Sequence, residues 1–595
     1  MILQSLNELY SRLADDPAYE IAPPGFSPQK ISFRIVIKPD GTLFAIEDAR
    51  VRSARGKLEP DRMETPLHEK RTSGIKAQFL CDKQEYLIGR QLEGKRDGAG
   101  AECFAEFKKI HLSYEGSIDT PSYSALCRFL ETWSPTEAEK HPILDQIGTN
   151  FGVFQILGTC GYLHDDPKIK AWWSNRQLAA DFVGIEEQCL VTGEVARICR
   201  IHPDIKGFKS SVALVGIQEN TSYESYGRSK AENCPISEEV AFRYATALNA
   251  LLDGPQKSKH RININGTTAI FWTERPTIIE DCLAGIFTGG LPAADQFQDV
   301  AKRLQIQRLL QAVRSGKKFQ EFGEPETPFY ILGLEQPNPG RFSIRFFHRS
   351  TVAGLLAQLH DHQKSFEIVR QYTEQNGSLK PDPEFPSIMD ILRQTPPPKG
   401  NWPDDEKISP LLSGALTRAI VEGTPYPEGL FSAIIRRIQS DRTINYLRAA
   451  TIKAVLVRNH HQTIPIMLDT ESTDPAYLLG RLFSTLEKTQ EDALGNVNAG
   501  IRDRFYSAAS ATPASVFPRL LRTYQHWLSK LNGGAKVNRE RLVQEIMASI
   551  GSSGFPNQFP LKKQGIFAIG YYHQRKDFFT KKEAPSSTET ESAPV

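Results

Sequence analysis

Two His-Asp pairs, His164 with Asp165 and His360 with Asp361, are the residues whose types could support metal-dependent chemistry. An imidazole and a carboxylate together can hold a divalent ion, which can activate water against a phosphodiester. Short pairs of this kind also arise by chance, and His360, Asp361 and His362 fall within a predicted helix. Consecutive side chains of a helix point in different directions, so they cannot meet at one metal ion. The sequence therefore argues against a catalytic metal site at either pair.

Other motifs of catalysis and cofactor binding are missing from the sequence. It contains no GxxxxGKS or GxxxxGKT phosphate loop, no HExxH and no GxSxG. All eight cysteines lie in the first half of the chain and none forms a CxxC pair, so we expect reduced, mostly buried thiols. The chain is therefore expected not to be an enzyme and to bind neither a metal nor a cofactor.

Three loops of the first half combine basic residues with glycine and small polar residues. They are residues 68–76 (HEKRTSGIK), 206–211 (KGFKSS) and 220–230 (NTSYESYGRSK). Hydroxyl groups, free backbone N–H groups and basic side chains can hold phosphate oxygens, and a tyrosine can stack on a base. Each loop alone is equally typical of a solvated charged loop, but the three together favour a polyanion partner. The candidate residues are Lys70, Arg71, Ser73, Lys76, Lys206, Lys209, Asn220, Tyr226 and Lys230.

The C-terminal end of the chain is strongly basic. Residues 502–576 hold 12 Lys and Arg against 3 Asp and Glu, whereas the whole chain has a net charge of only +2. Clustered cations bind polyanions through Coulomb attraction and counterion release. Residues 564–579 are rich in aromatics, and we expect their apolar half to be core and residues 573–576 to face a partner. The candidate contacts are Arg502, Arg504, Arg519, Arg522, Arg575 and Lys576.

The elements that carry these residues are predicted to be mixed in the first part of the chain. Residues 31–46 form a predicted hairpin around Pro39, Asp40 and Gly41. Ser237 is a plausible N-cap before a helix that reaches residue 252. Further helices are expected at 101–112 and 122–133, and strands at 155–157, 188–192, 195–201, 261–272 and 341–348.

Helical spacing of apolar residues then continues almost to the end of the chain. Helices are predicted at 475–493, 498–509, 514–531 and 539–550, after a proline-rich break at 396–403. The fold class is therefore α+β, with a mixed first region that has short antiparallel strands and an all-α bundle after it. The predicted domains are 1–350, a helical connecting region at 351–465, a basic bundle at 466–582 and a disordered tail at 583–595.

The composition is that of an ordinary globular protein, with 40% hydrophobic and 24% charged residues. No run of about 18 uncharged apolar residues occurs, so no membrane span is expected. Residues 1–16 have a helical apolar stripe with charges that follow at once, which is unlike a signal peptide. We therefore expect a cytoplasmic protein.

Many segments of the chain, in order, resemble the large subunit of type I-C CRISPR surveillance complexes. In the first half they include MILQSLNELYSRLADD, IAPPGFSPQKISF, RTSGIKAQFLCDKQEYLIG, CLVTGE, ARICRIHPDIKG, YESYG, ALNALL and TTAIFWTERP. Near the end they are YLLGRLFSTLEKTQ, IRDRFYSAASATPASVFPRLL and QGIFAIGYYHQRKDFF. Residues 212–220 depart from the family pattern, where a longer Ser- and Gly-rich version is usual.

The resemblance implies a non-catalytic subunit of an RNA-guided antiviral complex. Such a subunit engages the protospacer-adjacent motif in duplex DNA, helps to start strand separation and stabilises the R-loop, while the guide RNA reads the sequence. Its partners would be the guide RNA, the target duplex, the displaced strand, the other subunits and a helicase-nuclease recruited in trans. From side-chain chemistry and loop position, and not from the resemblance, we assign the candidate residues to these partners. The adjacent motif and duplex are assigned to Lys70, Arg71, Ser73 and Lys76, the RNA handle or duplex to Lys206, Lys209, Asn220, Tyr226 and Lys230, and the displaced strand to the C-terminal cations.

The family also makes its C-terminal region separately, as a small subunit, from an internal start. Met467 is the matching methionine here, and the alternative is that it is an ordinary core residue. Two other functions stay open for the whole chain. One is a metal-dependent nuclease of the same pathway, and the other is a structural scaffold whose basic helices contact protein subunits.

Overall fold

The computed structural model describes residues 1–52, 56–68, 71, 74–92, 94–147, 150–179, 185–219, 221, 223–288, 300–315, 324–370, 372–375, 378–400, 402–495, 498–550 and 554–579. The chain packs into two compact units. The first contains Met1–Ile205 and Ala213–Ala250, and the second contains Lys206–Val212 and Leu251–Val595. The predicted tail at 583–595 lies outside the described residues.

The first unit is built on a five-stranded sheet. Strand β1 (Phe26–Ile37) is central: it pairs antiparallel with β2 (Leu43–Asp48) and β5 (Asp61–Pro66), and parallel with β7 (Phe151–Ile156). Strand β6 (Cys81–Lys83) pairs antiparallel with β7. The β1–β2 pair confirms the predicted hairpin. Helices α3 (Ala99–Ile118) and α4 (Pro121–Thr132) pack on this sheet through Phe107 and Phe129, which are buried beside Phe33 and Phe154.

The remaining elements of the first unit are short strands and helices. Helix α7 (Glu238–Asp253) begins where the Ser237 hydroxyl accepts the Val240 N–H at 3.3 Å, which confirms the predicted cap. Strand β8 (Glu186–Gln188) is shorter than predicted, because Cys189 donates to Glu194 O at 2.8 Å and the chain turns back into β9 (Val195–Arg197). The other helices are α1 (Ile2–Ala14), α2 (Gln84–Leu87), α5 (Ile143–Ile147) and α6 (Pro167–Ala179), and the other strands are β3 (Val51–Arg52), β4 (Leu58–Glu59) and β10 (Asp204–Ile205). Strand β11 (Val212–Ala213) lies at the boundary between the two units in the sequence.

The second unit begins with an antiparallel sheet in the order β12-β13-β14-β15. Its strands are Arg261–Ile264, Thr267–Thr273, Pro328–Asn338 and Arg341–Thr351. Asn265 (φ +47°) and Gly266 (φ +89°) make the turn between β12 and β13, so the stretch predicted as a strand at 261–272 forms a hairpin. Strand β15 pairs only with β14, so it is an edge of the sheet as far as the described strands go.

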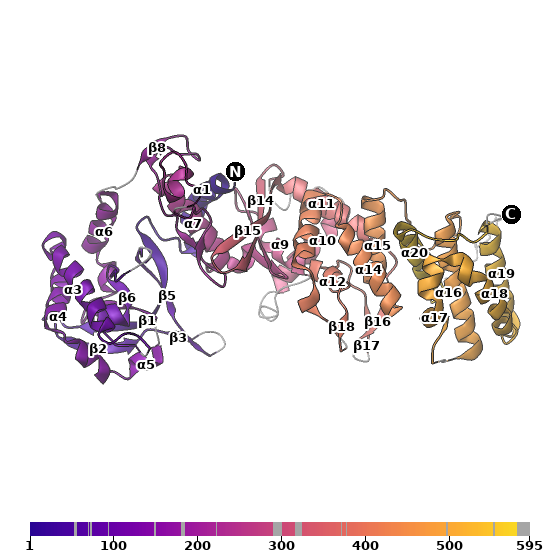
Figure 1. Ribbon diagram of the computed structural model, residues 1–595, viewed down its shortest axis with the longest axis horizontal. Helices are drawn as coiled ribbons and strands as arrows, with labels where there is room; N and C mark the ends of the chain where they lie inside the picture. Colours follow the sequence, from indigo (N-terminus) through magenta and orange to yellow (C-terminus); the bar gives the residue numbers. More distant parts are fainter. Residues whose placement is uncertain are drawn as a thin grey trace, which may run out of the picture. The chain divides into compact units, whose positions relative to one another are not determined.

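Helices make up the rest of the second unit (Figure 1). They are α8 (Lys257–His260), α9 (Ile278–Thr288), α10 (Val300–Ser315), α11 (Val352–Phe366), α12 (Ile388–Leu392), α13 (Pro410–Glu422), α14 (Glu428–Asp441), α15 (Tyr446–Arg458), α16 (Pro475–Leu494), α17 (Ile501–Ala511), α18 (Pro513–Leu528), α19 (Gly533–Ile550) and α20 (Leu561–Asp577). Two hairpins interrupt them: β16 (Tyr372–Gln375) with β17 (Ser378–Pro381), and β18 (Pro398–Lys399) with β19 (Trp402–Pro403). The α+β fold class is therefore confirmed.

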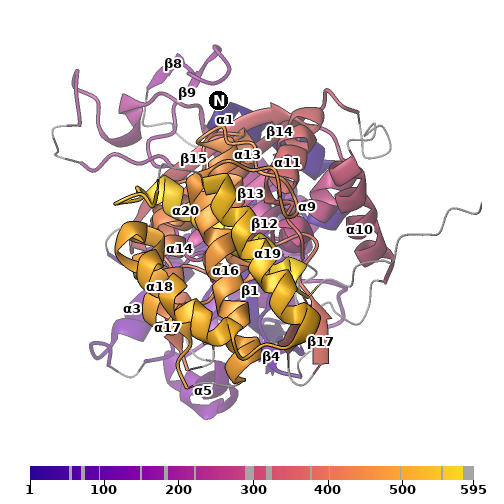
Figure 2. The same ribbon diagram turned by 90° about the vertical axis from the view of Figure 1, so that its right-hand side faces the viewer.

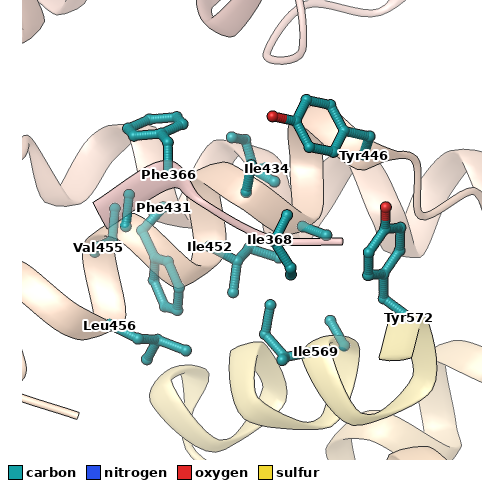
Figure 3. Packing of buried hydrophobic residues seen from close by; sticks show 14 of the residues in the cluster. Phe366, Ile368, Phe431, Ile434, Tyr446, Ile452, Val455, Leu456, Ile569 and Tyr572 are labelled. Carbon is teal, nitrogen blue, oxygen red and sulfur yellow. The ribbon is translucent and has the colours of Figure 1, made fainter. Parts of the chain in front are cut away.

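One hydrophobic core runs from β12 to α20 and crosses residues 350 and 465, the positions at which the sequence predicts domain boundaries. The reason is that the end of the chain returns: Ile569 and Tyr572 of α20 pack beside Ile452 of α15 and the buried Ile368 (Figure 3). The proline-rich segment at 396–403 forms the β18–β19 hairpin within this unit. None of the described helices has a stretch long and apolar enough to cross a membrane.

Candidate nucleic-acid interface

Three of the predicted C-terminal arginines lie exposed on neighbouring helices. Arg504 belongs to α17, and Arg519 and Arg522 belong to α18, which packs against α17 (Figure 2). The Arg519 guanidinium lies 5.4 Å from the centre of the Phe505 ring, next to Arg504 in the chain. Within the described part of the chain, no carboxylate forms an ion pair with these three arginines, so their charges are available to an external anion.

The charge of this helix pair is strongly one-sided. Residues 501–530 contain five Lys and Arg and a single acid, Asp503. That acid caps its own helix, because its Oδ2 accepts the Gly500 N–H at 2.9 Å. The α17–α18 pair therefore presents a cationic surface, which attracts phosphates.

Arg502 and Arg575, in contrast, neutralise a buried carboxylate of their own bundle. Arg502 Nε lies 3.4 Å from one oxygen of Glu487, and Arg575 Nη1 lies 3.8 Å from the other. Arg575 also pairs with Glu491 at 2.7 Å, and the Tyr571 hydroxyl donates to Glu487 Oε2 at 2.5 Å. Burial raises the pKa of Glu487, while the charges of Arg502 and Arg575 act to lower it. These two arginines thus hold α16, α17 and α20 together.

Residues 573–576 are less accessible than the sequence predicts. The prediction that they face a partner is wrong for His573 and Gln574, which are 1% and 0% exposed. The Tyr477 hydroxyl bonds His573 Nδ1 at 2.9 Å, and Arg481 Nε donates to Gln574 Oε1 at 3.1 Å. Lys576 is half-buried at the end of α20.

Replacing Glu487 with glutamine should destabilise the C-terminal bundle by about 2 kcal/mol. Breaking a buried ion pair leaves charges uncompensated, which lowers the free energy of unfolding. The loss is reduced here because the Arg502 and Arg575 side chains are still 35% and 20% exposed to water. Urea unfolding followed by circular dichroism measures the loss. Glu545→Gln is the control, since Glu545 pairs with Arg541 at 3.7 Å on the surface and should change stability by less than about 0.5 kcal/mol. Equal effects of the two changes would contradict this assignment.

The first predicted loop is held by its own arginine. The Arg71 guanidinium pairs with the buried Asp82, Arg71 Nε donates to Lys76 O at 2.6 Å, and the guanidinium lies 4.0 Å from the centre of the Tyr86 ring. Burial raises the pKa of Asp82, while the Arg71 charge opposes that shift. Arg71 therefore fixes the loop, and Lys76 is exposed beside it. Lys70 and Ser73 lie outside the described residues.

The second predicted loop is fastened to the sheet of the second unit. Ser210 N–H donates to Gln336 Oε1 at 3.1 Å, and Gln336 Nε2 donates back to Ser210 O at 2.8 Å. The Phe208 and Phe342 rings lie 4.8 Å apart. Lys209 is exposed between these anchors, while Lys206 is half-buried.

The third predicted loop presents an aromatic ring and keeps its charges paired. Tyr226 is 98% exposed although its φ is +54°, a backbone conformation that costs energy in a residue with a side chain. Lys230 Nζ pairs with Glu219 at 3.1 Å, and Arg228 pairs with Glu187 at 2.6 Å. Asn220 lies outside the described residues. Of the candidates in this loop, Tyr226 is the side chain left open to a partner.

Side chains of the two His-Asp pairs are buried or bonded to other groups of the protein. His164 is 1% exposed and burial lowers its pKa to about 4, while Asp165 accepts the Tyr162 N–H at 3.1 Å and pairs with Lys170 at 3.4 Å. His360 Nδ1 lies 2.5 Å from Val313 O. Among the residues that the structure describes, no three His, Cys, Asp or Glu side chains gather where they could hold one metal ion.

One further feature, on strand β15, was not found by sequence reasoning. Arg341 and Arg349 are exposed on β15, and no described carboxylate pairs with either of them. Their even spacing in an alternating strand was the signal that could have found them.

Met467 is 64% exposed in the loop between α15 and α16, so the alternative that it is a core residue is wrong.

Comparison with known protein families gives one match over almost the whole chain. Residues 6–579 match the family described as CRISPR-associated protein (Cas_Csd1). The comparison with curated proteins finds no match.

Proposed function

The chain belongs to the Cas_Csd1 family of CRISPR-associated proteins, and from this membership we propose that it is the non-catalytic large subunit of a type I-C surveillance complex. In that role it engages the protospacer-adjacent motif in duplex DNA, helps to open the strands and stabilises the R-loop. Its partners are the guide RNA, both target strands, the other subunits and a helicase-nuclease recruited in trans. The family match over residues 6–579 carries this proposal.

The exposed arginines of α17 and α18 are proposed to hold the displaced DNA strand. Their support is the combination of exposure, missing ion pairs among the described residues and the single acid of residues 501–530. Single-stranded DNA presents a flexible chain of phosphates, which a cationic helix surface can follow without reading bases. Arg502 and Arg575 stabilise this surface from beneath, through Glu487.

The loops of the first half are proposed to contact the adjacent motif and the RNA handle. Lys76 extends from the loop that Arg71 fixes through Asp82, so its position is set before DNA binds. Lys209 and Tyr226 are the exposed members of the other two loops. The paired state of Lys230 argues for a structural role of that lysine.

Met467 is proposed as the start of a separately made small subunit. Its exposed loop precedes α16, and the fragment that it would begin contains all five helices from α16 to α20. The most extensive helix contact of the second unit, between α16 and α20, lies within that fragment.

The displaced-strand role is tested by the triple change Arg504→Gln, Arg519→Gln and Arg522→Gln. The logarithm of the binding constant for single-stranded DNA falls with the logarithm of salt concentration, by about 0.7 for each phosphate contact. The triple variant should therefore show a slope that is shallower by about 2. Filter binding over a series of salt concentrations measures it.

Arg541→Gln is the control, because Arg541 is also exposed in the same bundle but pairs with Glu545. An unchanged slope in the triple variant would favour the scaffold alternative. Cleavage of duplex DNA with Mg²⁺ or Mn²⁺ that is lost on changing His164 or His360 would instead favour a nuclease.

A further inference from the structure

A short hairpin interrupts one edge of the five-stranded sheet. Strand β2 ends with Asp48, opposite Phe33 of β1. Strand β5 begins with Asp61, opposite Ile31 of the same strand. Ile31 also pairs with Phe151 of β7, so β5 lies on the other side of β1 from β7, where β2 lies as well. The chain therefore leaves the edge after Asp48 and returns to it at Asp61, and β3 pairs with β4 in between.

The base of this hairpin is fixed to the sheet. The Arg50 guanidinium donates from Nε and Nη2 to the Asp48 carboxylate at 2.9 and 2.7 Å. Its Nη1 donates to Gln146 O at 3.2 Å. The Ala49 N–H donates to Ser32 O at 3.0 Å. The hairpin thus starts from a held backbone, which reduces the ordering that binding a partner would require.

The hairpin itself, residues 51–59, stands outside the core. Val51, Arg52 and residues 56–59 are all exposed, and the apolar side chains of Val51 and Leu58 are 48% and 46% exposed. A two-stranded hairpin is by itself at best marginally stable in water. The described part of the hairpin therefore provides contact surface and not core packing.

The register separates the two faces of the hairpin. Arg52 lies directly opposite Leu58, and Val51 lies directly opposite Glu59. Residues that are directly opposite in an antiparallel pair point to the same face. One face therefore carries a cation beside an apolar side chain, and the other carries a carboxylate. Among the described residues, no carboxylate pairs with Arg52, so its charge is open to an external anion.

The sequence around this face is basic. Residues 50–57 (RVRSARGK) contain four cations and no acid. Arg50 is neutralised by Asp48, whereas Arg52 and Lys57 are exposed. Arg55 lies outside the described residues. A segment of this charge attracts phosphates.

The shape of a two-stranded ribbon selects among polyanions. Its strands are about 5 Å apart, and such a ribbon fits the major groove of B-form DNA, which is about 12 Å wide. The minor groove is only about 6 Å wide. The major groove of an RNA duplex is too narrow for side chains to reach the bases, and a single strand offers no groove. Duplex DNA is therefore the polyanion that matches both the charge and the shape of the hairpin.

We propose that the β3–β4 hairpin binds duplex DNA in the major groove, with the face of Arg52 and Leu58 toward the base pairs. Arg52 supplies donors to a guanine edge, and Leu58 supplies an apolar contact of the kind that a thymine methyl group accepts. The face of Val51 and Glu59 stays toward solvent, which keeps the carboxylate away from the phosphates. The inference rests on the proposed engagement of duplex DNA, and it adds a contact outside the three predicted loops.

The test compares two changes on opposite faces of the hairpin in the full chain. Leu58→Asp places a carboxylate against the DNA, whereas Val51→Asp places one on the solvent face. Both side chains are exposed to a similar extent, so neither change should alter urea unfolding. Mobility shift with a short labelled DNA duplex should show weaker binding for Leu58→Asp than for Val51→Asp. Equal affinities of the two variants would overturn the assignment of the faces.

Arg52→Gln tests the contact with the groove. The salt slope for duplex DNA should become shallower by about 0.9, and the slope for an RNA duplex of the same sequence should not change. Dimethyl sulfate methylates guanine N7, which faces the major groove. The unchanged chain should protect guanines beneath the hairpin, and the variant should lose that protection. Arg96→Gln is the control, because Arg96 is 70% exposed in the same unit but pairs with Glu102.

An unchanged DNA slope or unchanged guanine protection in Arg52→Gln would overturn the proposal, and so would an equal change with the RNA duplex. Loss of assembly with the other subunits, with DNA binding intact, would assign the hairpin to a protein partner instead. Failure of the proposed function looks different, because the unchanged chain would then show no salt-dependent binding of duplex DNA, and both proposals would fall. Failure of this inference alone leaves wild-type duplex binding in the Arg52→Gln variant.

Discussion

Replacing Gly480 or Gly570 with alanine should destabilise the second unit by about 3 kcal/mol, although alanine normally stabilises a helix. Helices α16 and α20 lie side by side (Figures 1 and 2), and each carries one of the two glycines at a point where its backbone meets the other helix. A Cβ atom on Gly480 would stand 2.1 Å from Phe567 O, and one on Gly570 would stand 2.2 Å from Tyr477 O. Both obstacles are backbone atoms, so the helices must move apart and lose the packing around them.

The predicted loss of stability has the opposite sign to the usual effect of replacing glycine with alanine in a helix. Alanine is favoured over glycine in a helix interior by about 1 kcal/mol, and Gly534→Ala, in the first turn of α19, should show a smaller gain of the same sign, since nothing lies within 4 Å of its Cβ position. Urea unfolding followed by circular dichroism compares the three variants. Combining the two core changes should cost less than their sum, because both act on one crossing. A stabilised Gly480→Ala protein would mean that the two helices are not in close contact.

Local elements were predictable from the sequence because their signals are local. The hairpin of β1 and β2 has its turn residues between two apolar runs, and the cap at Ser237 lies directly before its helix. The strand predicted at 188–192 ends at Gln188 because Cys189–Glu194 make a turn, and Leu190 in this turn is 68% exposed. Apolar character alone did not distinguish these two outcomes.

The candidate site was less predictable because ion pairs join residues far apart in the sequence. Arg575 and Glu487 are separated by 88 positions, so the basic count of residues 502–576 could not show which cations are neutralised. Ser210 and Gln336 are separated by 126 positions, and that contact decides where Lys209 lies. Composition indicated a polyanion partner, whereas only the packing separates exposed from internal arginines.

Acidification from pH 6.5 towards pH 4 should unfold the protein, through histidines that are buried in the neutral form. Burial lowers the pKa of His111, His164, His202 and His573 to about 4, and that of His362 to about 3. Because an unfolded histidine has a pKa near 6.5, the unfolded chain binds these protons first as the pH falls. The stability that depends on burying these histidines in the neutral form is thus fully present above pH 6.5 and is lost as the pH falls towards 4.

The expected loss is large for a protein of ordinary stability. At pH 5.5 each such histidine costs about 1.4 kcal/mol, so the five together cost on the order of 7 kcal/mol, against a typical total of about 5 to 15 kcal/mol. Asp82 and Glu487 oppose this trend, because burial raises the pKa of each carboxyl and the folded chain then binds their protons first.

The histidine assignment is tested by His573→Gln, which keeps an acceptor for the Tyr477 hydroxyl but cannot gain a proton. Its stability should fall less steeply between pH 6.5 and pH 4 than that of the unchanged chain, as measured by urea unfolding at each pH. His526→Gln is the control, because His526 is exposed on α18. If the two variants show the same pH slope, charging of His573 does not contribute to acid unfolding.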